Sequence, residues 1–232
     1  MSDLKEILKE NKNIVKKKRR LQWILLWAVV LTIGLAWRDE IYFRAIAFVV
    51  PVAMMTGMIG GFLNGRWVCG NLCPRGAFWD RITPKFSRKI GIPKIMRNMP
   101  LRWIIFSALM GFMAFNLLRG DITDWKHWAF VFWLMCTVTT VIGLILMFLF
   151  EPRGWCSICP VGTFGNAIGG GINQLQIDSE NCKGCLICEK VCPMKLPIII
   201  EYKDSGVMSN RDCIKCNECI GVCPKNVLSF KK

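Results

Sequence analysis

The sequence predicts an α-helical membrane protein with four transmembrane helices in two parallel repeats, followed by a small α+β domain rich in cysteine. Three observations lead to this fold class. The 232-residue chain is 53% hydrophobic, with 10 Trp, 12 Met and 14 Phe, which is too apolar for an ordinary soluble domain. Four apolar segments are long enough to be membrane spans. Thirteen cysteines occur mostly in closely spaced groups, which favours metal binding over disulfides.

The four apolar segments occupy the first two thirds of the chain. They cover residues 21–37, 45–61, 103–118 and 128–150, and the last has no charged residue over 23 positions. At about 1.5 Å per residue, each segment can cross a hydrocarbon core of roughly 30 Å, the shorter ones with help from interfacial side chains. Pro51 lies in the second segment, where neighbouring groups or water can satisfy the carbonyl that it frees.

Basic residues predict the orientation of these spans. Residues 1–20, a basic N-terminal segment, contain eight Lys or Arg against three acids, and residues 62–100 contain eight against one acid. Both segments should therefore be cytoplasmic, and four spans return the C-terminal segment to the same side. A basic flank beside a membrane span is explained by topology and anionic lipid, so we expect a lipid membrane as partner and no nucleic acid.

The last segment, residues 175–232, contains one cysteine pattern twice. It reads NCKGCLICEKVCP from Asn181 and DCIKCNECIGVCP from Asp212, each of the form C-x2-C-x2-C-x3-C-P. This run is typical of bacterial [4Fe–4S] sites, in which the fourth cysteine of each motif ligates the other cluster. The alternative is a zinc knuckle or a disulfide cluster, since zinc also takes four thiolates. The predicted ligands are Cys182, Cys185, Cys188 and Cys223 for one cluster, and Cys213, Cys216, Cys219 and Cys192 for the second.

With these motifs, the segment resembles the two-cluster ferredoxin domain. The resemblance implies two short βαβ-like halves, with strands at 175–177, 198–202 and 227–230. The preceding glycine-rich segment GNAIGGG, residues 165–171, is expected to be either a flexible joint or a place of close backbone packing.

The membrane domain, residues 21–174, also repeats. Residues 73–78 read CPRGAF and residues 159–164 read CPVGTF; each follows an even-numbered span and is preceded by a Trp and a second Cys. Two copies in the same orientation are related by a pseudo-twofold axis along the membrane normal, which brings both cysteine loops together on the cytoplasmic face. The loops contribute four thiols: Cys69, Cys73, Cys156 and Cys159.

Four thiolates are enough for a third iron–sulfur cluster between the two halves. We favour a [4Fe–4S] cluster. A [2Fe–2S] cluster or another metal at the same four ligands is an alternative, because four cysteines serve either cluster type. Redox-active dithiols and structural thiols are the remaining interpretations. The two loops space their cysteines by three and by two residues, so the ligand geometry is not expected to be symmetric.

The combination resembles the NapH/NosR-type membrane polyferredoxin family. The similarity covers the four spans, the two cysteine-proline loops and the two-cluster tail, although the family commonly has three residues between the cysteines of the second loop. The resemblance implies a quinol dehydrogenase membrane subunit, an electron-transfer part of a quinone-linked oxidoreductase complex. It also implies a multi-pass location in the prokaryotic cytoplasmic (inner) membrane, with both termini cytoplasmic.

The predicted function is electron transfer between a cytoplasmic or membrane redox partner and the quinone pool. The expected partners are other redox subunits, a soluble ferredoxin, flavodoxin or flavoprotein, and quinone. Near the clusters are four lysines, which either steer an acidic partner or are solvated surface. A redox-sensing or maturation protein that supplies electrons to another metalloenzyme is the alternative. No catalytic residue is assigned. The four lysines are Lys183, Lys190, Lys215 and Lys225.

Four other polar residues in or near the spans are expected to bind no cofactor. His127 is the only histidine, which excludes bis-histidine haem ligation within one chain, and it is expected to be interfacial. Cys136 is expected to be a buried, inert thiol inside the fourth span. Arg44 and Arg102, near span ends, are expected to extend toward water. The spans carry Thr and Ser at mid-depth rather than acids, which disfavours ion translocation.

Overall fold

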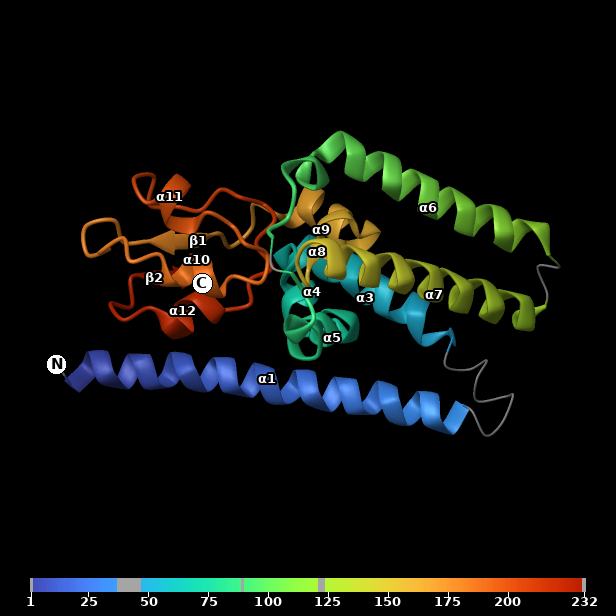
Figure 1. Ribbon diagram of the computed structural model, residues 1–232, viewed down its shortest axis with the longest axis horizontal. Helices are drawn as coiled ribbons and strands as arrows, with labels where there is room; N and C mark the ends of the chain where they lie inside the picture. Colours follow the sequence, from blue (N-terminus) through green and yellow to red (C-terminus); the bar gives the residue numbers. More distant parts are fainter. Residues whose placement is uncertain (1, 37–46, 89, 121–123, 231–232) are drawn as a thin grey trace.

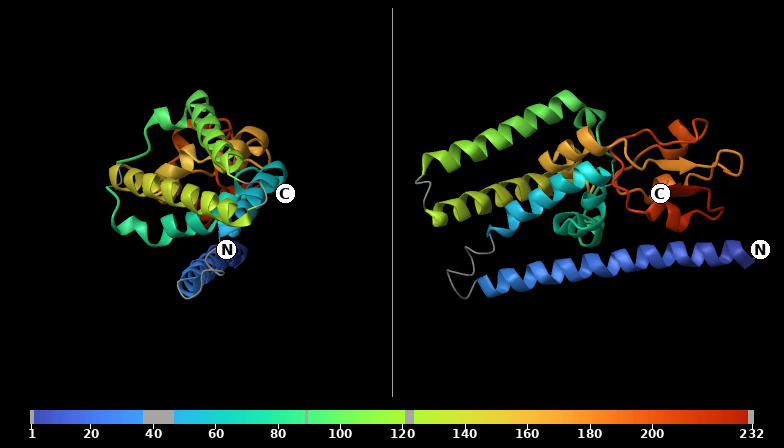
Figure 2. Two further views of the ribbon diagram at one scale, coloured as in Figure 1. Left: turned by 90° about the vertical axis from the view of Figure 1, so that its right-hand side faces the viewer. Right: turned by 180° about the vertical axis from the view of Figure 1, so that it is seen from behind.

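The computed structural model describes residues 2–36, 47–88, 90–120 and 124–230. Four long helices run roughly parallel along the molecule, and the cysteine-rich C-terminal part lies at one end of them (Figures 1 and 2). The first helix is the longest and also extends alongside the C-terminal part. These helices are α1 (Ser2–Ala36), α3 (Val49–Asn64), α6 (Met99–Arg119) and α7 (Trp125–Leu149).

Helices α6 and α7 are long and apolar enough to cross a membrane by length and composition. Only 6% of the most apolar window of α6 and 33% of that of α7 are buried within the chain, whereas the core helix of a soluble protein would be mostly buried. Helix α3 is also apolar but has 16 residues. The predicted first two spans extend into residues 37–46, which lie outside the described part of the chain.

The two helices have recognisable ends. Pro100 lies in the first turn of α6, where a missing N–H costs nothing, and Gly120 follows the last residue of that helix. The Asp124 carboxylate caps α7 by accepting a hydrogen bond from the Lys126 N–H at 2.9 Å.

Two short helices follow the second and the fourth of the long helices. After α3 come α4 (Trp67–Asn71) and α5 (Pro74–Arg81); after α7 come α8 (Gly154–Ile158) and α9 (Pro160–Gly169). Helix α1 packs on α5 as α6 packs on α9, and α3 packs on α4 as α7 packs on α8. This correspondence supports the predicted internal repeat. The connector between the halves contains two 3-10 helices, η1 (Thr83–Lys85) and η2 (Lys94–Arg97).

Helix α9 joins the two halves by packing closely on α3. The Cα of Gly165 lies 3.2 Å from where a Cβ on Gly61 would be, and a Cβ on Gly169 would meet the backbone of Gly61 and Gly65. Residues 165–171 were expected to be either a flexible joint or a place of close backbone packing. Gly165 and Gly169 belong to helix α9 and show the close packing.

The C-terminal part is built on one pair of antiparallel strands, β1 (Leu175–Ile177) and β2 (Leu228–Phe230), with Leu175 opposite Phe230. Three short helices surround the pair: α10 (Ile187–Val191), α11 (Ile198–Tyr202) and α12 (Glu218–Val222). The strands expected at 175–177 and 227–230 are confirmed, the second one residue shorter.

The strand expected at 198–202 is wrong, because these residues form helix α11. The Glu189 carboxylate, in the first cysteine motif, accepts hydrogen bonds from the N–H groups of Ile199 and Ile200 at 2.6 and 3.0 Å, and so caps the helix that follows. Three successive isoleucines suggest a strand by local preference, but this tertiary cap overrides it.

Candidate iron–sulfur sites

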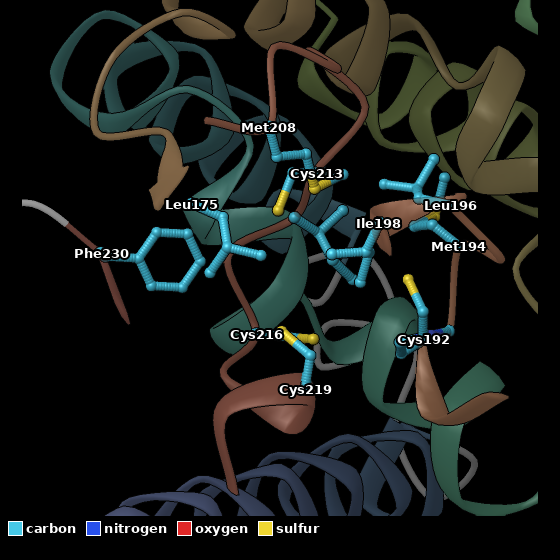
Figure 3. A pocket seen from close by; sticks show the side chains of 12 residues that line it. Leu175, Cys192, Met194, Leu196, Ile198, Met208, Cys213, Cys216, Cys219 and Phe230 are labelled. Atoms are coloured by element: carbon cyan, nitrogen blue, oxygen red, sulfur yellow. The ribbon is translucent and has the colours of Figure 1, made fainter. Parts of the chain in front are cut away.

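The structure gathers the thiols of the second predicted ligand set around one small cavity in the C-terminal part. Apolar side chains, among them Leu175, Met194 and Met208, form the rest of its wall (Figure 3). One of the four thiols comes from the first motif, which is the exchange that the sequence predicts. The four are Cys192, Cys213, Cys216 and Cys219.

Three of the four thiols of the first predicted ligand set belong to the same core. Cys188 is buried, and its pKa is raised to about 11 by burial and, to smaller extents, by the nearby charges of Glu189 and Cys223. Cys182 packs against this core. All thirteen cysteines lie in the described part of the chain, and Cys185 alone among them is exposed.

Both motifs have a backbone shape that suits an anionic cluster. The residue before the second cysteine and the residue after it are left-handed in each motif, with φ of 67° and 57° at Gly184 and Leu186, and 50° and 61° at Lys215 and Asn217. Such alternation turns successive N–H groups into a concave surface that binds anions. The residues present therefore fit a cluster of iron, sulfide and thiolate at each motif.

The four membrane-loop thiols lie close to one another. Cys69 is in α4 and Cys156 is in α8, while Cys73 and Cys159 are the residues that cap α5 and α9. Burial raises the pKa of Cys69 to about 12; Arg66 acts against this rise, and charges on the other three thiols add to it. The structure thus brings the two cysteine loops together in one buried region between the halves.

Two buried arginines, which the sequence analysis missed, flank this region. Arg66 and Arg153 each stand three residues before the first cysteine of their loop, and each reaches into the other loop. The Arg66 guanidinium donates to the Cys156 carbonyl oxygen, and the Arg153 Nη1 donates to the Cys69 carbonyl oxygen at 3.0 Å. The shared R-x-x-C spacing was a signal that the sequence contained.

Two glycines at equivalent positions make room for these arginines. A Cβ on Gly76 would lie 3.0 Å from the Arg153 guanidinium, and a Cβ on Gly162 would lie 2.9 Å from that of Arg66. The glycine in each CP-x-G sequence therefore permits the contact between the halves.

Carboxylates balance both arginines. Asp80 accepts from Arg153 at 2.7 and 2.8 Å, and Asp212 accepts from Arg66 at 2.8 Å and from Arg102 through two bonds of 2.7 Å. Burial would raise the pKa of Asp212, but the hydrogen bond from Arg102 and the two guanidinium charges outweigh it and lower that pKa. The expectation that Arg102 extends toward water is wrong, because it is fully buried in this network.

The second cysteine motif lies directly on the membrane loops. A Cβ on Gly70 of α4 would collide with the Ile214 carbonyl oxygen, and Cys69 and Cys156 pack against the C-terminal core. The Lys215 Nζ donates to the carbonyl oxygens of Asn64, at 2.9 Å, and Ile172. Lys215 is buried, so both interpretations given for it, a partner-steering charge and a solvated surface lysine, are wrong.

Helix α1 covers the second motif from the other side. The Lys18 Nζ donates to the Cys216 carbonyl oxygen at 3.2 Å and pairs with Glu218 at 3.4 Å. A Cβ on Gly221 would lie 2.7 Å from Val15. Residues 1–20, expected from their charge to flank the first span, thus include a face that binds the cysteine-rich part.

The remaining predicted residues lie outside these sites. The His127 ring Nε2 lies 2.8 Å from the Asn116 carbonyl oxygen and links the ends of α7 and α6. Cys136 is half-buried in α7, rather than fully buried as expected. Arg44 lies outside the described residues.

Family models match both parts of the chain. A 4Fe-4S binding domain matches residues 46–93 and 129–173, which include the two membrane cysteine loops. A 4Fe-4S dicluster domain matches residues 181–228. No solved structure matches the chain.

Curated relatives extend over both parts. The ferredoxin-type protein NapH of Haemophilus influenzae is 31% identical over 72% of this chain and 63% of its own length. The methylamine utilization ferredoxin-type protein MauN of Methylobacillus flagellatus is 30% identical over 64% of this chain and 54% of its own length. An uncharacterized protein of Methanocaldococcus jannaschii is 25% identical over 77% of this chain and 70% of its own length.

The chain thus spans less than two thirds of the length of NapH and MauN. The matched regions include both the membrane cysteine loops and the C-terminal cysteine motifs. The chain is thus related to NapH-type ferredoxin proteins, and its two parts match a 4Fe-4S binding domain and a 4Fe-4S dicluster domain.

Proposed function

We propose that the protein is a membrane-bound electron-transfer subunit with three iron–sulfur clusters, which moves electrons between a redox partner and the quinone pool. In this proposal four helices span the membrane and both termini are cytoplasmic. Cys182, Cys185, Cys188 and Cys223 hold the first cluster, and Cys213, Cys216, Cys219 and Cys192 hold the second. Cys69, Cys73, Cys156 and Cys159 hold the third, which we take as [4Fe–4S].

One observation carries the proposal: the second motif is seated on the two membrane cysteine loops. Ile214, which follows the ligand Cys213, lies against Gly70, which follows Cys69. The first motif in turn contributes Cys192 to the cavity of the second. The three thiol sets therefore form a continuous series from the C-terminal end of the molecule to the membrane helices.

The protein's own residues position and insulate this series. When bound, iron–sulfur clusters supply one-electron transfer. The buried guanidinium groups of Arg66 and Arg153 compensate the negative charge of the thiolates beside them, and the surrounding apolar core excludes water. Electrostatic balance and burial are the means by which a protein sets such potentials.

Counting iron tests the number of clusters. About twelve irons per chain in anaerobically purified protein would support three cubanes, and about ten would favour a [2Fe–2S] third centre. Cys69→Ser and Cys159→Ser should each lose the same electron paramagnetic resonance (EPR) signal and keep the signals of the two ferredoxin clusters. Cys136→Ser, which removes a thiol that belongs to none of the three sets, is the matched control. About eight irons in the wild type would contradict the third cluster.

Quinol oxidation tests the proposed role. Membranes that contain the protein and its partners should show cluster reduction when quinol is added, or reoxidation of reduced clusters when quinone is added. If the clusters respond to neither quinol nor quinone at any accessible potential, the quinone-linked function is excluded. A redox-sensing or maturation function would then remain. Reporter fusions at each end would check that both termini are cytoplasmic.

A further inference from the structure

The two cysteine motifs share one spacing but have opposite surroundings. Residues 212–222 of the second motif are almost entirely buried or half-buried, against α1, α4 and the segment after α3. In residues 181–191 of the first motif, most side chains are exposed or half-buried, and Cys188 alone is buried. The chain therefore covers one motif and leaves the other open.

Equivalent positions show the difference directly. Cys185 is exposed, while its counterpart Cys216 is 8% exposed. Lys183 is exposed, while its counterpart Ile214 is packed on Gly70.

The same contrast holds farther along the motifs. Ile187 is 39% exposed, while its counterpart Glu218 is buried and paired with Lys18. Lys190 is exposed, while its counterpart Gly221 lies against Val15. At these positions the membrane domain and α1 thus cover what the first motif presents to solvent.

The first motif also lies at the far end of the molecule. The orange segment that follows β1 lies at one end of the molecule, and the C-terminal end of α6 and the N-terminal end of α7 lie at the other, both in Figure 1 and in the reverse view of Figure 2. In the proposed topology this end points away from the membrane into the cytoplasm. A soluble protein can therefore reach it without meeting lipid.

The open surface has a basic and apolar character. Lys183, Lys190 and Lys225 are exposed. Ile187, which lies between the first two lysines in sequence, is 39% exposed, and Val191, directly after Lys190, is 37% exposed. Within residues 181–191 the one carboxylate, Glu189, is occupied in capping α11. Glu180 and Asp178, just before the motif, are neighbouring exposed acids, and Asp178 accepts hydrogen bonds from Asn181. An apolar centre with surrounding lysines suits a transient partner whose redox centre is ringed by acidic side chains.

We propose that the first motif, through Cys185 and the lysines Lys183, Lys190 and Lys225, is the docking surface for a soluble one-electron carrier with an acidic surface. The proposal rests on the proposed electron-transfer function and adds the end of the series at which electrons are exchanged. In the reducing direction the carrier loses one electron and the first cluster gains it; no bond changes, and the second motif has no open face for such a partner.

Charge reversal of the three lysines tests the surface. The probe is a reduced flavodoxin with an acidic surface, and the reduction rate of the clusters is followed by stopped-flow absorbance at several salt concentrations. The variant Lys183→Glu, Lys190→Glu, Lys225→Glu should lower the second-order rate constant about tenfold or more at low salt, and it should lose most of the salt dependence. Arg211→Glu, which changes an exposed charge at the membrane-facing side of the same domain, is the control and should keep the wild-type rate.

An uncharged reductant separates docking from cluster loss. Photoexcited deazariboflavin should reduce the wild type and the triple variant at the same rate, with the same iron content and EPR signals in both. Suppose that deazariboflavin reduces both proteins at the same rate. If flavodoxin then also reduces the wild type and the triple variant at equal rates, or if Arg211→Glu slows reduction by flavodoxin as much as the triple variant does, the proposed docking surface is wrong, although the clusters are present. If the wild type holds no reducible cluster, the proposed function itself fails.

Discussion

Arg66 and Arg153 are the residues that most directly affect the membrane thiol site. Each is fully buried, and Arg153 also lies 3.8 Å from the Cys156 Sγ. Reduction adds one negative charge to a cluster, so a nearby buried cation favours the reduced form and raises the potential. A unit charge about 5 Å away, at an effective dielectric constant of about 20, is worth roughly 3 kcal/mol, or on the order of 100 mV for one electron.

Removing the charge of Arg153 should therefore lower the midpoint potential of the third centre. We expect Arg153→Gln to shift it down by on the order of 100 mV, and Arg153→Lys to shift it less because the charge is kept. EPR-monitored redox titration measures the shift. The two ferredoxin clusters and the control Arg88→Gln, at an exposed arginine, should keep their potentials. An equal shift in all three centres would show that the variant disturbs the whole fold.

The thiols of this site predict a pH dependence of cluster assembly. Burial raises the pKa of Cys69 to about 12, and it also raises the pKa values of Cys73 and Cys156. Iron-free protein therefore holds protonated thiols at neutral pH, whereas iron binds thiolates, so binding releases protons and strengthens as pH rises toward those pKa values. Iron affinity during anaerobic reconstitution should rise between pH 7 and pH 8.5, by about tenfold per pH unit for each proton released. An affinity that is flat or falls over this range would contradict the assignment.

At the scale of elements, α1 differs most from its sequence interpretation. Its second half is apolar and its first half is basic, which together predict a span with a cytoplasmic flank. The structure adds a stripe along one face, spaced by three or four residues as a helix requires. Its members are Asn11, Val15, Lys18, Gln22 and Leu26, and they contact α5, α12 and the loop before β2 or are buried.

A glycine on α12 tests this contact. A methyl group on Gly221 would lie 2.7 Å from Val15, so Gly221→Ala should destabilise the cysteine-rich part by about 1–3 kcal/mol. Val15→Ala should recover much of the loss in the double variant. The measurement is the midpoint of thermal bleaching of the cluster absorbance in detergent. Gly171→Ala, where the methyl group would meet no atom within 4 Å, should have little effect; equal destabilisation there would contradict the packing argument.

The sequence predicts those elements whose cause is local. The apolar runs of α6 and α7 follow from composition, and the residues of β1 and β2 follow from the resemblance to the two-cluster ferredoxin domain. The C-x2-C-x2-C-x3-C repeat predicts which thiols share the cavity of the second motif. Helix α11 was missed because its cap comes from the side chain of Glu189, which lies in the first motif and 10 residues before Ile199. The burial of Arg102 was missed because its partner Asp212 is 110 residues away in sequence.

At the scale of the whole molecule, Asp212 joins the cysteine-rich part to the membrane part. It accepts from Arg66 after α3, from Arg102 in α6 and from Asn166 in α9, at 2.7–2.8 Å. Three separate segments of the membrane part therefore meet at one carboxylate beside Cys213, a proposed cluster ligand. Its counterpart in the first motif is Asn181, which is exposed and bonds to Asp178 of its own domain.

Replacing this carboxylate should loosen the contact between the two parts. Asp212→Asn leaves two buried guanidinium groups without a counter-ion, which typically costs about 3–5 kcal/mol. We expect a lower thermal midpoint and faster proteolysis of the link at residues 170–174. Asp178→Asn, an exposed carboxylate in the same domain, should change the thermal midpoint little. An unchanged midpoint and cleavage rate in Asp212→Asn would show that other contacts hold the parts together.

The exchange of arginines between the two cysteine loops couples the two halves of the membrane part. Arg66 donates to the carbonyl oxygen of Cys156 in the other loop, and Arg153 donates to that of Cys69. Each loop is therefore held by a side chain of the opposite half, so a change at either arginine acts on the cysteines of both.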